Sequence, residues 1–303
     1  MQKRVWTVDQ IPDQSGRIAL VTGANSGIGY ETAKALAVKG ATMILACRSS
    51  SKGEEAAAAI LRDHPSAKVE TLALDLSSLA SVRAFAQRFR SKFSALDLLI
   101  NNAGVMTPPY AKTEDGFELQ LGTNHLGHFA LTGLLIDRLL KTDGSRIVTV
   151  SSMAHQVGKV DFDDLHREKR YRRMEAYGQS KLANLLFTYE LQRRLEQAGS
   201  AAIAVAAHPG WTGTNLQRHN RLFEFFNPLL AQKPEMGALP TLYAAVSPDV
   251  RGGDYFGPEG FIEMKGYPKK VSSNTRSHDR ETAAKLWELS EALVAVRFDF
   301  SPV

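Results

Sequence analysis

The stretch "TGANSGIG", Thr22–Gly29, follows the apolar run "RIALV" and precedes the helix-like stretch "YETAKALAVKG". It contains three glycines, Gly23, Gly27 and Gly29. A strand, a glycine-rich turn and a helix in this order bring free backbone N–H groups and the positive end of a helix dipole to one point, which suits a pyrophosphate. Tight strand-to-helix turns also need glycine for backbone reasons alone. The turn therefore needs a second signal before it indicates a ligand.

Apolar, β-branched runs recur along the chain, with alanine- and leucine-rich segments between them. Nearly continuous apolar runs are typical of strands buried on both faces, and the segments between them are long enough for crossover helices at 51–64, 77–93 and 176–199. We expect helix caps at Gly40 and at Ser77 or Ser78. The alternation predicts an α/β doubly wound parallel sheet, a Rossmann fold. The expected strands are Arg17–Val21, Ala41–Cys47, Lys68–Leu74, Leu96–Ile100, Arg146–Val150 and Ala202–Ala207.

The 303 residues have an ordinary globular composition, with 44% hydrophobic and 23% charged residues. There is no internal repeat or linker, so we expect an N-terminal extension over residues 1–15 and a single domain over residues 16–303. The formal net charge is +5, but the basic residues are dispersed apart from "HREKRYRR", His166–Arg173, and we expect no nucleic-acid partner.

The only cysteine is Cys47, which excludes an intrachain disulfide and a cysteine-based zinc cluster, and we expect no metal site. The N-terminal sequence lacks the apolar stretch of a signal peptide, and no run reaches the roughly twenty apolar residues of a membrane helix. We therefore expect a soluble protein in the reducing cytoplasm, with no transmembrane segment.

Tyr177 and Lys181 are four residues apart and share a face if their segment is helical. A phenol with a pKa of about 10 handles protons poorly at pH 7 unless a nearby cation favours its ionised form, which Lys181 could do. The pair also fits an ordinary amphipathic helix. Ser151 and Ser152 follow one expected strand and Asn101 follows another, at the sheet edge where ligands bind, although Ser and Asn also favour such turns without a ligand.

Assembled, these residues resemble the classical short-chain dehydrogenase/reductase family over roughly residues 16–294. The matching elements are "TGANSGIG", "LDL", "NNAG", "TNHLGHF", "IVTVSS", "YGQSK" and "HPGWTGT", in the family's order. The segments "NHLGHFALT", "SSMAH" and "SKLANLLF" look most like the retinol dehydrogenase and protochlorophyllide reductase-like branch.

The resemblance implies a role for each catalytic candidate. Tyr177 would be the general acid in carbonyl reduction and the base in the reverse reaction. Lys181 would lower the pKa of Tyr177 and bond the nicotinamide ribose. Ser152 would hold the substrate oxygen, since the family's serine is the second of such a pair. Asn124 would organise a water-linked proton relay, or would stabilise a helix kink, or both.

The place usually taken by an acid that binds a ribose 2′-hydroxyl reads "ILACRSS", with Arg48 and no acid. A guanidinium suits a 2′-phosphate, so we expect NADP(H), although a lone arginine could also simply face solvent. Cys47 is expected to be a buried apolar residue beside the adenosine. The resemblance implies cofactor contacts at Gly23, Asn25, Ser26, Gly27, Ile28, Gly29, Arg48, Asp75, Leu76, Asn102, Ala103, Gly104, Tyr177, Lys181, Pro209, Gly210, Thr212 and Thr214.

Two segments are expected on the substrate side. An insertion at about 153–176 could touch the substrate or cover a subunit edge, and a lid at about 211–236 is rich in aromatic residues. That lid favours an apolar carbonyl or alcohol substrate, although its aromatics could also pack in the core or touch a membrane. His155 looks like a packed loop histidine more than an extra acid.

The expected function is NADP(H)-dependent carbonyl reduction or alcohol oxidation. A non-catalytic NADP(H) sensor and a double-bond reductase of the protochlorophyllide reductase type are the alternatives. A homo-oligomer is left open.

Overall fold

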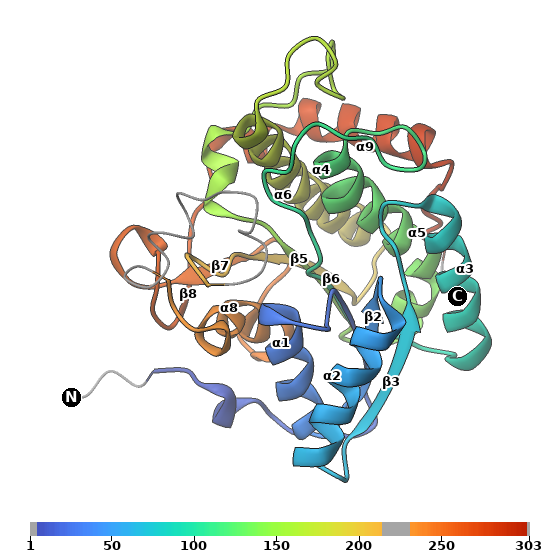
Figure 1. Cartoon of the computed structure of the whole chain (residues 1–303), viewed down its shortest axis with the longest axis vertical. Coiled ribbons are helices and arrows are strands. Elements are labelled where there is room, and N and C mark those ends of the chain that lie inside the picture. The colour runs from blue at the N-terminus through green and yellow to red at the C-terminus, as the bar shows by residue number, and fades with distance from the viewer. Residues whose placement is uncertain (1–4, 214–230, 302–303) are drawn as a thin grey trace.

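The computed structural model describes residues 5–213 and 231–301 (Figure 1). Eight strands form one sheet in the order β3-β2-β1-β4-β5-β6-β7-β8, and every neighbouring pair is parallel except β7 and β8. This is the expected doubly wound α/β fold in a single domain. The strands are β1 (Ile18–Thr22), β2 (Thr42–Cys47), β3 (Lys68–Ala73), β4 (Leu98–Asn101), β5 (Arg146–Val150), β6 (Ile203–Ala207), β7 (Tyr255–Pro258) and β8 (Pro268–Lys270).

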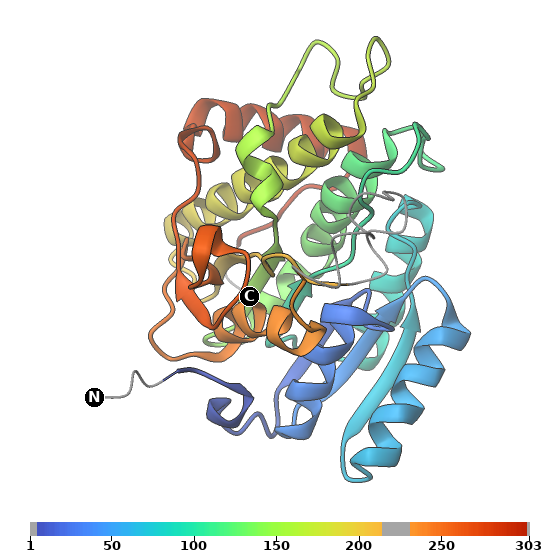
Figure 2. The same ribbon diagram turned by 60° about the vertical axis from the view of Figure 1, so that its left-hand side comes forward.

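Helices cover both faces of the sheet (Figures 1 and 2). On one face α3, α5, α6 and α9 contribute to one apolar cluster, and on the other face α1, α2 and α8 contribute to a second. None of the helices in the described ranges is both long and apolar enough to cross a membrane. The helices are α1 (Gly27–Val38), α2 (Ser50–Asp63), α3 (Leu79–Lys92), α4 (Leu119–Leu121), α5 (Gly127–Leu140), α6 (Arg173–Gln197), α8 (Pro234–Val246) and α9 (Arg280–Val294).

Strand β1 shows how the apolar runs specify this layering. Leu20 packs into the cluster under α3 and α5, whereas Ala19 and Val21 pack into the cluster under α1 and α8. Successive side chains of a strand point to opposite faces, so a strand covered on both sides must be apolar throughout.

All six expected strands are confirmed to within two residues at either end, and the helices expected at 51–64, 77–93 and 176–199 are confirmed to within three. Ser78 caps α3 by accepting a hydrogen bond from the Ser81 backbone N–H, and Gly40 follows the end of α1 with φ +99°. The sequence reading missed β7 and β8, which are short and contain proline or exposed lysine, so they lack the apolar pattern of the inner strands.

The N-terminal extension lies against the body of the domain where it is described. Trp6 packs edge-on against Tyr243, with ring centroids 5.1 Å apart, and Ile11 is 3% exposed.

Candidate active site

The strand order reverses between β1 and β4, so the segments that follow their carboxyl ends meet at one edge of the sheet. The glycine loop follows β1 there. Gly23 and Gly27 have φ of +67° and +56°, which glycine adopts most easily. At Gly29 the reason is space, because a Cβ would lie 2.5 Å from both the Gly23 carbonyl oxygen and Asn102 Nδ2. The close neighbours that require a glycine at position 29 are therefore other residues of this chain.

The segment after β4 holds the glycine loop from the other side. The backbone N–H groups of Asn102 and Ala103 both donate to Thr22 Oγ1, each at 2.9 Å. Asn102 Nδ2 donates to the Thr22 carbonyl oxygen at 2.8 Å. Two cofactor candidates, Asn102 and Ala103, thus also have a structural role in fixing the loop.

The first turn of α1 fits a phosphate group. Ser26 is the N-cap of α1, and its side chain makes no capping hydrogen bond. The N–H groups at the start of the helix are therefore not satisfied by the usual serine cap. Beside them, the backbone N–H groups of Ala24 and Asn25 act to lower the pKa of the Cys47 thiol, but burial outweighs them and raises it to about 11. Cys47 is a buried neutral group, as expected.

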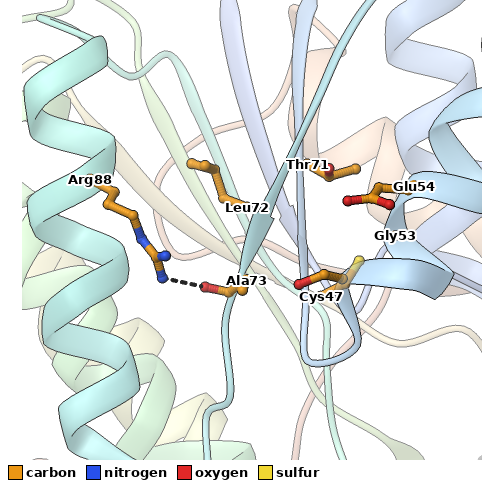
Figure 3. Close-up of a pocket in the computed structure, with 8 residues that line it drawn as sticks. Cys47, Gly53, Glu54, Thr71, Leu72, Ala73 and Arg88 are labelled. Atoms are coloured by element: carbon orange, nitrogen blue, oxygen red, sulfur yellow. Dashed lines mark hydrogen bonds between the residues drawn. The ribbon is translucent and has the colours of Figure 1, made fainter.

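Arg48 follows β2 and is exposed, and no described residue forms a hydrogen bond or ion pair with it. Ser49 caps α2 by accepting a hydrogen bond from the Lys52 N–H at 3.4 Å. An exposed guanidinium at the N-terminus of a helix suits an anion. A cavity of about 210 Å³ lies nearby, lined by Cys47, Ser50, Gly53, Glu54, Thr71, Leu72, Ala73 and Arg88 (Figure 3).

Asp75 and Leu76, expected near the adenine, lie in the turn after β3. The Asp75 carboxylate accepts hydrogen bonds from the Ser77 N–H and hydroxyl, at 2.9 and 2.6 Å. Leu76 is buried, and its carbonyl oxygen would lie 2.4 Å from a Cβ on Gly127. Both residues therefore also serve the local turn and its packing against α5.

Ser152 and Tyr177 are brought together at the carboxyl end of β5. The Ser152 hydroxyl is close enough to the Tyr177 phenol to lower its pKa, and Ser152 Oγ accepts from the Ala154 N–H at 3.2 Å. Ser151 faces elsewhere, since its hydroxyl donates to the Lys181 carbonyl oxygen at 2.8 Å. The geometry thus favours Ser152 over Ser151 as the residue beside the tyrosine.

Lys181 lies one helical turn from Tyr177, with Nζ 5.7 Å from the centre of the tyrosine ring. Its ammonium donates to the Val150 carbonyl oxygen at 3.0 Å. Burial lowers the pKa of Lys181 to about 8 and raises that of Tyr177 to about 12, while the neighbouring Ser152 hydroxyl acts to lower the pKa of Tyr177. The pKa of Tyr177 is thus raised overall, opposite to the expected net lowering, because desolvation dominates and no lowering by Lys181 is resolved.

Asn124 lies in a π-helical turn, Gly122–Leu126, between α4 and α5. Its side chain pairs with the backbone of Val105 in both directions, at 2.8 and 2.9 Å, and donates to Ser180 Oγ at 2.9 Å. A Cβ on Gly104 would lie 2.9 Å from Asn124 Oδ1 and 3.7 Å from Lys181 Nζ. Because Gly104 has no side chain, the side chains of Asn124 and Lys181 can both lie close to its backbone.

The turn after β6 contains three further cofactor candidates. Gly210 has φ +66°, and Thr212 Oγ1 donates to the Pro209 carbonyl oxygen at 2.8 Å. The expected lid begins here. Its two described ends pair, since the Gln232 N–H donates to the Trp211 carbonyl oxygen at 2.9 Å. Thr214 and the aromatic residues at 223, 225 and 226 lie outside the described residues, and positions 234–236 already belong to α8.

The insertion expected at about 153–176 includes a loop, 158–172, that projects from the molecule in both views (Figures 1 and 2). Tyr171 anchors it: its hydroxyl donates to the Pro108 carbonyl oxygen and accepts from Gln120 Nε2, each at 2.9 Å. Gln120 Oε1 in turn accepts from the Thr107 N–H at 2.8 Å. The insertion is thereby tied to the segment that follows "NNAG".

His155 is packed, as expected, and is 2% exposed. Its Nδ1 lies 2.7 Å from the Ser152 carbonyl oxygen, and its Nε2 accepts from the Asn274 N–H at 3.3 Å. Sequence reasoning missed Thr22, His128 and the pair His208–Glu263, whose atoms Nε2 and Oε2 are 2.9 Å apart beside the Pro209 turn. The histidines in "NHLGHF" and before "PGW" were visible in the motifs, but nothing in the sequence named their partners.

Comparison with known proteins identifies the family. The family model described as short chain dehydrogenase matches residues 17–224. The chain belongs to the short-chain dehydrogenase/reductase family. It falls in the retinol dehydrogenase-like branch: it is 43% identical to retinol dehydrogenase 12 of Mus musculus over 296 residues, covering 96% of this chain and 89% of that protein.

Two solved structures of the short-chain dehydrogenase/reductase fold place the relationship in space. An uncharacterized protein from Mycobacterium paratuberculosis is 47% identical, with a TM-score of 0.84, and the match covers 98% of this chain and 100% of that one. A short chain dehydrogenase from Shigella flexneri, complexed with NADP, is 25% identical with a TM-score of 0.65, covering 81% and 98%. The chain is thus a member of an oxidoreductase family.

Proposed function

We propose that this chain transfers a hydride between NADP(H) and an apolar carbonyl or alcohol, with Tyr177 as general acid and base. The carrying observation is the convergence of three side chains: Ser152 acts on the pKa of the buried Tyr177, and Lys181 Nζ lies 5.7 Å from the centre of the tyrosine ring. The bound nicotinamide supplies or accepts the hydride. Ser152 holds the substrate oxygen, and Tyr177 gives that oxygen a proton during reduction.

The pKa values support different protonation states of Tyr177 in carbonyl reduction and in alcohol oxidation. With a pKa of about 12, Tyr177 is protonated at pH 7 and is ready to act as an acid in reduction. Alcohol oxidation needs the phenolate, so its rate should rise with pH. Lys181, with a pKa of about 8, is mostly charged at pH 7 and favours that phenolate electrostatically.

Exposed Arg48 at the start of α2 supports a 2′-phosphate and hence NADP(H). The Shigella flexneri relative, which was solved with NADP, supports the same choice. The relatives named retinol dehydrogenase make retinal and other long apolar aldehydes the first substrates to test. The cytoplasmic location stays a prediction, and the oligomeric state stays open.

The test is Tyr177→Phe, which keeps the ring and removes the proton. Turnover of an aldehyde with NADPH should fall about 10²- to 10⁴-fold, the usual contribution of a general acid, while NADPH affinity measured by fluorescence stays unchanged. Tyr189→Phe is the matched control, because Tyr189 is a buried tyrosine of the same helix whose hydroxyl contacts Ser273 at 2.8 Å.

Near wild-type turnover in Tyr177→Phe would overturn the mechanism. A wild-type protein that binds NADPH tightly but oxidises it with no carbonyl would instead support the sensor hypothesis.

A further inference from the structure

His128 lies one turn after Asn124, at the start of α5, and is 1% exposed. Its imidazole spans two segments that the proposed function uses separately. Nε2 lies 2.8 Å from Thr22 Oγ1, at the base of the glycine loop. Nδ1 lies 3.0 Å from the backbone carbonyl oxygen of Asn124.

The partners fix the tautomer of this histidine. A carbonyl oxygen can only accept, so Nδ1 carries the proton and donates it to Asn124. Nε2 is then an acceptor, and the Thr22 hydroxyl donates to it. The lone pairs of Thr22 Oγ1 remain for the N–H groups of Asn102 and Ala103, each 2.9 Å away. The longer contact from Thr22 Oγ1 to the Ile100 carbonyl oxygen, at 3.4 Å, competes only weakly for the same proton.

The surroundings keep His128 neutral. Burial lowers its pKa to about 4; the hydrogen bond to Asn124 acts in the opposite direction, and the positive charge of Lys181 lowers the pKa further. The other titratable group facing it is His125, which is itself buried and neutral. At pH 7 His128 is therefore held in a single tautomer with one donor and one acceptor.

We infer that His128 is a positioning residue that sets the cofactor loop and the Asn124 turn relative to each other. The bond to Thr22 holds the glycine loop together with Asn102 and Ala103. The bond to the Asn124 carbonyl oxygen holds the π-helical turn in place. The side chain of Asn124 then reaches Val105 and Ser180. The second half of this inference rests on the proposed function, since Asn124 matters to turnover only if the site is catalytic.

Two substitutions of His128 test its bond to Thr22 and its bond to Asn124 separately. In His128→Asn the side-chain amide can replace Nδ1 and keep the bond to Asn124, but it is too short to replace Nε2. In His128→Gln the amide oxygen can replace Nε2 and keep the bond to Thr22, but the donor at Nδ1 is lost.

We expect His128→Asn to raise the NADPH dissociation constant about three- to tenfold, the value of one neutral hydrogen bond, with kcat within about twofold of wild type. His128→Gln should show the reverse, a kcat about three- to tenfold lower with NADPH affinity nearly unchanged. Affinity is read by NADPH fluorescence, and kcat with the aldehyde that the wild-type protein reduces fastest. Equal effects of the two variants on both quantities would overturn the inference.

The control is His125→Gln. His125 is also buried, in the π-helical turn that precedes α5, but its Nε2 faces Ser290 Oγ of α9 at 3.0 Å, away from the cofactor loop. It should lower the melting temperature without separating affinity from kcat. If the His128 variants behave like His125→Gln, the histidine only fills the core.

Thr22 supplies a second route if a His128 variant fails to fold. Thr22→Val should weaken NADPH binding and Thr22→Ser should restore it. Thr32→Val, which removes a buried hydroxyl that has no hydrogen-bond partner among the described residues, should not weaken it. A Thr22→Val protein with wild-type affinity would contradict the inference. These binding measurements need no turnover, so they decide the Thr22 half even if no carbonyl is reduced and the proposed function fails.

Discussion

The glycine loop and the 158–172 loop are held in place in different ways. Thr22 Oγ1 and the side-chain amide of Asn102, at the ends of β1 and β4, hold the backbone of the glycine loop through hydrogen bonds, and no room is left for a Cβ at Gly29. The 158–172 loop is held by hydrogen bonds between pairs of side chains, such as Tyr171 with Gln120 and Arg167 with Gln179. A loop that is packed tightly around its own backbone fixes one ligand shape, whereas a side-chain-held loop can be altered one contact at a time.

The largest effect is expected from Gly29→Ala. The new Cβ would lie 2.5 Å from the Gly23 carbonyl oxygen, so the loop must shift. We expect a loss of about 1–3 kcal/mol in the free energy of unfolding, as for other overpacked sites, and NADPH binding weaker by about a hundredfold. Urea unfolding and NADPH fluorescence measure these two quantities.

The matched control for Gly29→Ala is Gly53→Ala in α2, where a Cβ would come no closer than 3.4 Å to Cys47 Cβ. It should bind NADPH as the wild type does. Equal tolerance at Gly29 and Gly53 would show that the glycine loop is not held rigidly by its backbone.

Arg48→Ala should have the next largest effect, because it removes a charge-assisted contact to the 2′-phosphate. We expect NADPH affinity to fall about ten- to a hundredfold, or roughly 1.5–3 kcal/mol, with little change for NADH. Arg62→Ala is a charge-matched control near the far end of the same helix, where the arginine pairs with Asp63. A wild-type protein that prefers NADH, or an equal loss for both cofactors, would contradict the NADP(H) assignment.

The sequence predicts the features that depend on local patterns, but not those that depend on contacts between distant residues. The strands around the glycine loop were predictable from their apolar runs, and the nearness of Ser152 and Tyr177 was implied by the family resemblance. The reason for Gly29 was not, since the neighbouring Asn102 is more than seventy residues away in the chain. The direction of the Tyr177 pKa was also missed, because it depends on how completely α6 is buried.

Low pH should destabilise the fold through the buried histidines His125 and His128. Burial lowers the pKa of His125 to about 3 and of His128 to about 4, below the ordinary value of 6.5. The unfolded chain therefore takes up these protons first, so their contribution to stability is complete above pH 6.5 and is lost as the pH falls towards 4. Each can lower the free energy of unfolding by up to about 1.4 kcal/mol per pH unit.

Urea unfolding between pH 7 and 5 measures this slope. It should decrease in His125→Gln and remain unchanged in the control His278→Gln, which alters an exposed histidine. An unchanged slope in His125→Gln would mean that this histidine is not held neutral in the fold.

The smallest effect is expected from Tyr171→Phe, on the side-chain-held loop. The change removes the hydroxyl that bonds the Pro108 carbonyl oxygen and Gln120, at a cost of about 0.5–1.5 kcal/mol for a hydrogen bond. Because these contacts join the insertion to the segment after "NNAG", the KM of the carbonyl substrate should change by about two- to tenfold while NADPH affinity stays constant. Tyr110→Phe is the control, since Tyr110 packs against the Tyr171 ring at 5.1 Å and keeps that packing without its hydroxyl. If Tyr171→Phe weakens NADPH binding as much as it alters KM, the two loops are not independent, and the insertion supports the cofactor site as well as the substrate side.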